Sequence, residues 1–164
     1  SSMVAYNYHS VASGYYSYVD SIELAIAHGW RAIDALEQID NPSAYNIVPV
    51  WSYYNMAFFY DMYFQPPMVD SVRHYLGRAR ATVIGSRSRK DSLEALISIV
   101  DLEAWQEYYE HDYREAEAMM HEVLAMIDTV AQESPNTIIT ERAEAYEFLT
   151  MMAEEQGKWQ AAYG

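Results

Sequence analysis

The chain has 164 residues, enough for one domain with a buried core, and its 51% hydrophobic content excludes a disordered chain. Its formal net charge of −14 argues against binding nucleic acid through the whole surface. It has no cysteine, which excludes disulfides and thiolate metal sites. No apolar run reaches the roughly 18 residues of a membrane span, so we expect no membrane segment in this chain.

The spacing of apolar residues predicts helices along the whole chain, with no sustained alternation of the kind that strands show. The first helix is expected over residues 3–18. Its apolar series is Val4, Tyr8, Val11, Ala12, Tyr15 and Val19. Asp20 is expected to cap a second helix over residues 21–40. Asn41 and Pro42 predict the start of a third helix, which runs to about residue 64 and is either kinked at Pro49 or begins there.

Further helices are expected over residues 68–84 and from about residue 88 to 110. The last full helix should end at Gly157, because glycine is favoured just beyond a helix C-terminus. The residues from Lys158 to Gly164 predict the beginning of an eighth helix. Because it stops there, we expect the chain to be part of a longer protein.

The stretch from Leu102 to Asp128 predicts two helices folded back on each other about a polar break at residues 110–112. The second helix has an apolar face at the spacing of an amphipathic helix: Tyr113, Ala116, Met120, Val123 and Leu124. Such a hairpin leaves an apolar face that neighbouring hairpins must cover. We therefore predict an all-α fold, an α-solenoid of about three and a half antiparallel hairpins, forming a single domain over residues 1–164.

Residues 141–162 resemble a tetratricopeptide repeat. The matching positions are Tyr146, Leu149, Gly157, Trp159 and Ala162. When the earlier units are laid on this one, the small-residue position falls at Ser13, Ala57, Ala104 and Thr150. The period is then about 45 residues, against about 34 in the usual repeat. Several signature glycines are missing, so a related hairpin repeat and an ordinary helical bundle remain alternatives.

The resemblance implies a concave groove lined by the first helix of each pair. The groove positions carry Trp51, Tyr54, Phe58, Asp61, Asp101, Trp105, Tyr108, Tyr109, Glu147, Met151 and Glu154, with Asn7 and Ser10 from the first unit. An aromatic and acidic groove fits an extended peptide or a helix with basic and apolar side chains. The alternative is that these aromatic stripes belong to the core.

Motifs for other chemistry are absent from the sequence. There is no glycine-rich phosphate loop, no GxSxG and no cysteine nucleophile, so we predict neither an enzyme nor a cofactor. His111, Glu117 and His121 lack the HExxH pattern, so no metal site is predicted. The cations from Arg73 to Lys90 could dock an acidic partner, but we favour pairing with acids of the next unit.

The chain is also similar to the tetratricopeptide regions of bacterial sensor kinases and regulators. This resemblance implies a non-catalytic protein- or peptide-binding region of a signalling protein. A periplasmic or extracytoplasmic location is then favoured over the cytoplasm. The alternatives are a structural module that forms homodimers and a compact helical bundle with a small-molecule pocket.

Overall fold

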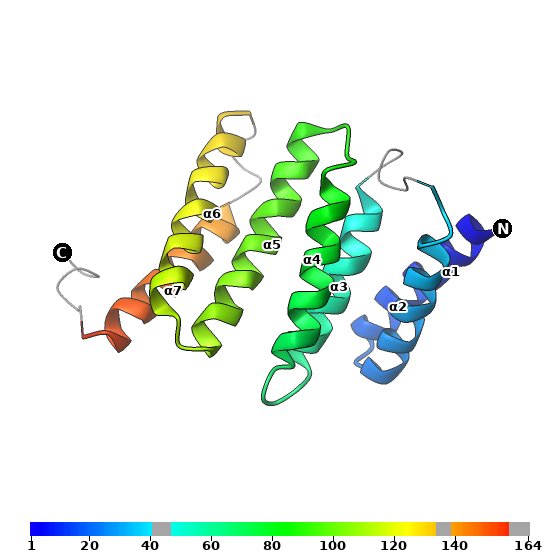
Figure 1. Cartoon of the computed structure of the whole chain (residues 1–164), viewed down its shortest axis with the longest axis horizontal. Helices are drawn as coiled ribbons and strands as arrows, with labels where there is room; N and C mark the ends of the chain where they lie inside the picture. Colours follow the sequence, from blue (N-terminus) through cyan, green and yellow to red (C-terminus); the bar gives the residue numbers. More distant parts are fainter. Residues whose placement is uncertain (41–46, 134–138, 158–164) are drawn as a thin grey trace. The chain divides into compact units, whose positions relative to one another are not determined.

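The computed structural model describes residues 1–40, 47–133 and 139–157, and these residues form α-helices joined by short turns (Figure 1). The described residues contain seven helices and no strand: α1 (Ser2–Tyr18), α2 (Ile22–Leu36), α3 (Val48–Met62), α4 (Val69–Val83), α5 (Arg89–Tyr109), α6 (Tyr113–Glu133) and α7 (Ile139–Glu155). The prediction of an all-α fold is confirmed. The predicted cap at Asn41 and the predicted eighth helix lie outside the described residues.

The chain divides into two compact units, Ser1–Ser92 and Leu93–Gly164. In the first unit α1 packs on α2, α2 on α3, and α3 on α4. In the second unit α6 packs on α7, and α5 shares a hydrophobic core with both. Consecutive helices within each unit run antiparallel and form hairpins (Figure 1). None of the described helices is both long and apolar enough to cross a lipid bilayer.

Pro49 marks the beginning of α3 rather than a kink within it. The helix begins at Val48, and Pro49 occupies its first turn. Proline is tolerated there because the first amide groups of a helix have no partner within the helix. Of the two alternatives for this helix, the later start is therefore the correct one.

The core of the second unit has small residues where its first two helices meet. Ala104 of α5 and Ala116 of α6 are both fully buried in the same cluster. Larger side chains fill the space beside them. The buried members are Ile97, Val100, Met120, Val123, Ile127, Val130, Ala145, Phe148 and Met152. The hairpin of α5 and α6 therefore buries one small residue from each helix in a shared core.

The helix α7 packs through a different face from the one predicted. Ala145, Phe148 and Met152 are buried, whereas Tyr146 is 57% exposed. Thr150 is only half-buried, and its hydroxyl donates a hydrogen bond to the Tyr146 carbonyl at 2.8 Å. The predicted small-residue position of this helix is wrong, because the small side chain that is buried against the core is Ala145. The small residues predicted for the other units are buried: Ser13, Ala57 and Ala104.

The inward face of α1 is polar, although its apolar series was expected to pack. Tyr6 and Ser13 are its buried residues. The Tyr6 hydroxyl lies 2.9 Å from Ser52 Oγ, and Ser13 Oγ donates to the Ala25 carbonyl at 2.7 Å. These bonds satisfy the hydroxyl groups of Tyr6 and Ser13. Most of the predicted apolar series is exposed instead: Val4, Tyr8, Val11, Tyr15 and Val19.

The turn that ends α1 has the geometry of a Schellman motif. Asp20 has a left-handed backbone, with φ of 60°. The amide of Ser21 donates to the Tyr16 carbonyl at 2.8 Å, and that of Asp20 to the Ser17 carbonyl at 3.2 Å. Asp20 therefore closes α1, and the N-cap of α2 is Ser21, which makes no side-chain cap bond. The predicted capping role of Asp20 is wrong.

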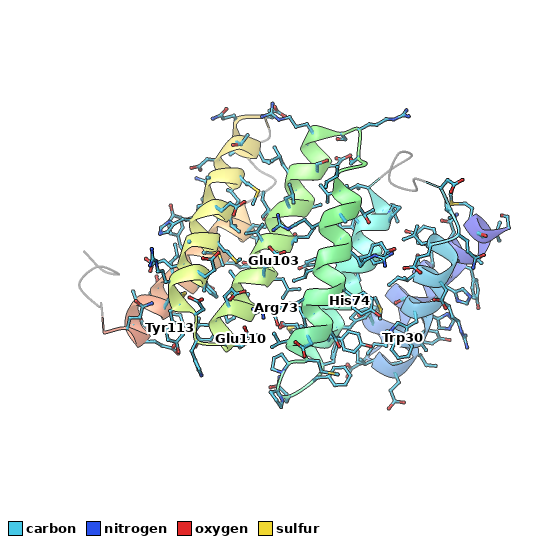
Figure 2. All side chains as sticks on the ribbon, viewed as in Figure 1. Trp30, Arg73, His74, Glu103, Glu110 and Tyr113 are labelled. Carbon is cyan, nitrogen blue, oxygen red and sulfur yellow. The ribbon has the colours of Figure 1, made fainter. Side chains whose placement is uncertain are left out.

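The same turn ends α5. His111 has φ of 65°, and the amide of Asp112 donates to the Glu107 carbonyl at 2.9 Å. His111 Nδ1 also lies 3.0 Å from the hydroxyl of Tyr113. Tyr113, which is labelled in Figure 2, is the first residue of α6. Gly157, with φ of 68°, follows the end of α7 as predicted. Positions 20, 111 and 157 are separated by 91 and 46 residues, which correspond to two periods and one period of the predicted repeat.

Candidate functional site

A cleft of about 370 Å³ lies within the second unit and is formed by α5 and α7. Its lining residues are Asp101, Trp105, Glu144, Glu147, Phe148 and Met151. Asp101 and Trp105 are four residues apart on α5, and on α7 Glu147 and Phe148 lie three and four residues after Glu144, so each set shares one helix face. Phe148 is buried, Asp101, Trp105 and Met151 are half-buried, and both glutamates are exposed. The cleft therefore has an apolar floor and an acidic rim.

The indole of Trp105 is held in place by two other rings. Its centroid lies 4.7 Å from that of Phe148 and 5.7 Å from that of Tyr108, and both contacts are edge-to-face, at 82°. Edge-to-face arrangements match the positive edge of one ring to the negative face of another. Because its neighbours fix its orientation, Trp105 presents a rigid aromatic surface to the cleft.

Tyr108 connects the C-terminal ends of α5 and α7. Its hydroxyl donates a hydrogen bond of 2.5 Å to Glu155 Oε1. This bond and burial raise the pKa of Tyr108 to about 12, because loss of the phenol proton would leave two negative charges in contact. The hydroxyl therefore stays protonated, and the link stays intact, at any pH near neutrality.

The charge around the cleft is strongly negative. Three carboxylates line it, and no lysine or arginine is among its lining residues. Arg142, on the same helix α7, pairs with Asp128 of α6 at 2.8 Å. The whole second unit has 16 acidic residues and three basic ones, whereas the first unit has eight and seven. A concave site lined by one sign of charge concentrates ligands of the opposite sign.

Four of the predicted groove residues come together in this cleft: Asp101, Trp105, Glu147 and Met151. Glu144 and Phe148 were missed. Phe148 follows the predicted Glu147 directly, and Glu144 lies three residues before it, on the same side of the helix. Tyr108, Tyr109 and Glu154 are not among the lining residues. The rings of Tyr108 and Tyr109 contact that of Trp105, and the ring of Tyr108 also contacts that of Phe148.

The remaining predicted groove residues lie in the first unit: Asn7 and Ser10 on α1, and the others on α3. The ring centroids of Trp51 and Tyr54 are 5.5 Å apart, and those of Tyr54 and Phe58 are 6.4 Å apart. These three side chains are half-buried. Asp61 is only 7% exposed, so its carboxylate is not presented on the surface as expected. The cleft itself is built from residues of the second unit alone.

One cation of the predicted basic run has a role within the first unit. Arg78 of α4 pairs with Glu37 at 2.6 Å and lies over the ring of Tyr53, 5.2 Å from its centroid. It therefore links α4 to α3 and to the end of α2. This agrees with a structural role for Arg78. Its acidic partner, however, lies earlier in the sequence, whereas we had expected an acid of the following repeat.

Comparisons with models of known protein families, with curated proteins and with solved structures each find no match. The function therefore has to be argued from the residues of the cleft.

Proposed function

We propose that this chain is a non-catalytic protein-binding module and that its cleft accepts a basic side chain of a bound peptide. The observation that carries the proposal is the cleft of the second unit, where three carboxylates surround an oriented tryptophan. Carboxylates attract an ammonium or guanidinium group, and the face of an indole attracts the same cation.

Both parts of a lysine or arginine side chain, the apolar stem and the charged end, match the surface of the cleft. Its methylene groups would pack on Trp105 and Met151, while its charged end would meet the carboxylates at the rim. The volume of about 370 Å³ exceeds that of one side chain and falls in the range of ligand pockets, so a neighbouring apolar residue also fits. The partner is therefore a peptide with basic and apolar side chains.

The membership of this module in a tetratricopeptide-like family is part of the same proposal. It is supported by the sequence resemblance and by the recurrence of one turn at about 46 residues. A role as the sensing or interaction region of a bacterial signalling protein, outside the cytoplasm, rests on that resemblance alone.

The cleft is tested by removing its charges without changing its shape. The double variant Glu144→Gln, Glu147→Gln should bind a short dye-labelled peptide of alternating lysine and leucine about tenfold more weakly than the unaltered chain. The measurement is fluorescence anisotropy at physiological salt. The matched control is Glu115→Gln, Glu122→Gln, which removes the same charge from exposed positions of α6.

The control variant distinguishes peptide binding at the cleft from a general attraction between a basic peptide and an acidic protein. Binding by the control variant should stay within about twofold of the unaltered chain, because these glutamates do not line the cleft. Equal weakening in both double variants would mean that only net charge matters, and the cleft would not be the site. Unchanged binding in the cleft variant would contradict the proposal directly.

A further inference from the structure

An exposed apolar stripe runs along α1. Val11 is 73% exposed and Tyr18 is 90% exposed, and the other members of the stripe are also mostly exposed. The stripe consists of Val4, Tyr8, Val11, Tyr15 and Tyr18. These positions recur at alternating spacings of four and three residues. This is the spacing of the apolar seam that pairs two helices in a coiled coil.

The stripe lies opposite the face that α1 buries. At 3.6 residues per turn its members fall within an arc of about 100°, while Tyr6 and Ser13 project to the other side of the helix. An apolar stripe of this width normally faces a core. Here the core side is already occupied by polar residues with hydrogen-bond partners in α2 and α3.

The charge of this surface favours another copy of the same chain. Residues 1–19 contain no Asp, Glu, Lys or Arg, although the whole chain has a net charge of −14. Two copies of an acidic protein repel each other wherever acidic surfaces meet. An uncharged helix is where they can approach without that cost.

The order of large and small side chains then specifies how two copies would pair. In an antiparallel pair with its two-fold axis midway between Tyr8 and Val11, Tyr8 faces Val11 and Val4 faces Tyr15. Each large side chain therefore meets a small one, as interlocking layers require. A parallel pair would place tyrosine against tyrosine. A pair related by a two-fold axis also closes on itself, so it does not form filaments.

We infer that α1 is a self-association surface and that two copies of this chain form a homodimer through antiparallel α1 helices. A buried tyrosine contributes roughly 150–250 Å², so the stripe offers on the order of 500–750 Å². Flanking side chains such as Met3 and Val19 add to it. Stable complexes bury about 800 Å² per partner, so the area suits a dimer of moderate affinity.

The first test is the mass in solution, measured by light scattering on a sizing column over a range from about 1 µM to about 1 mM. The unaltered 18.9 kDa chain should approach twice its mass as concentration rises. Val11→Glu places a charge at the centre of the pair and should weaken dimerisation by roughly a hundredfold or more. The matched control is Ala5→Glu, an equal charge change at an exposed position of α1 outside the stripe.

The second test uses the absence of cysteine from the chain to report the pairing. A mixture of Val4→Cys and Tyr15→Cys chains should form a disulfide-linked dimer on mild oxidation, because these positions face each other in the antiparallel pair. Either variant alone should cross-link poorly. Its two cysteines would be 11 residues apart along the pair, roughly 16 Å at 1.5 Å per residue.

Several outcomes would overturn the inference. One is a chain that stays monomeric at every concentration. A second is a dimer that Val11→Glu and Ala5→Glu affect equally. Stronger cross-linking in the single variants than in the mixture would contradict the antiparallel arrangement. A monomeric chain that binds phosphatidylcholine vesicles, and loses that binding with Val11→Glu, would assign the stripe to a lipid surface instead.

Discussion

At the scale of single residues, the turns between helices contain the most unusual conformations in this chain. Asp20 and His111 both have a left-handed backbone, which side chains with a Cβ adopt at a cost and glycine adopts freely. The turn nevertheless forms, because its two backbone hydrogen bonds satisfy the carbonyl groups at the helix end.

His111→Gly should therefore stabilise the chain, raising the free energy of unfolding by about 1 kcal/mol. His111→Ala keeps a Cβ in the left-handed conformation and loses the contact with Tyr113, so it should be no more stable than the unaltered chain. Urea unfolding followed by circular dichroism measures both. If glycine and alanine have the same effect at this position, the strain that we assign to the turn is absent.

At the scale of the elements, close approach decides how the helices of the first unit pack. Gly29 of α2 is buried, and a Cβ added there would overlap Met56 Sδ of α3. Met56 is itself fully buried, so it has little room to move away. By contrast, Gly77 in the middle of α4 is exposed and has open space around its Cα.

These two glycines give a matched pair of substitutions. Gly29→Ala should lower the free energy of unfolding by about 1–2 kcal/mol, since overpacking outweighs the gain in helix propensity. Gly77→Ala should raise it by about 0.5–1 kcal/mol, because only the propensity changes. Chemical unfolding of both variants distinguishes the effects. A stabilised Gly29→Ala chain would mean that α2 and α3 do not approach closely.

At the scale of the whole molecule, charge is distributed unequally along the chain. The second unit has 16 acidic residues against three basic ones, and the first unit is nearly balanced. Like charges within a compact unit repel one another, and dissolved salt screens this repulsion. The same screening weakens the attraction between the acidic cleft and a basic peptide. Stability and peptide binding should therefore respond to salt in opposite directions.

Raising sodium chloride from about 0.01 M to about 0.5 M should increase the thermal unfolding midpoint by roughly a few degrees. Over the same range, affinity for the lysine and leucine peptide should fall. The Glu115→Gln, Glu122→Gln chain has less repulsion to screen, so its midpoint should depend less on salt. A midpoint that falls with salt would mean that ion pairs such as Arg78–Glu37 outweigh the repulsion.

By itself, the sequence determined the helical fold and several of the places where helices begin and end. These depend on local properties: apolar spacing, proline at Pro49 and glycine at Gly157 all act within a few residues. Four residues of the cleft were also predicted, from the groove positions that the resemblance to a repeat family implied. Only the tertiary structure decided which face of α7 packs inward, and which of two conflicting signals holds for α1, its apolar series or the small residue Ser13. That choice depends on the fit between neighbouring helices: Ser13 bonds to the Ala25 carbonyl and Ala145 is buried, whereas the larger Val11 and Tyr146 stay exposed.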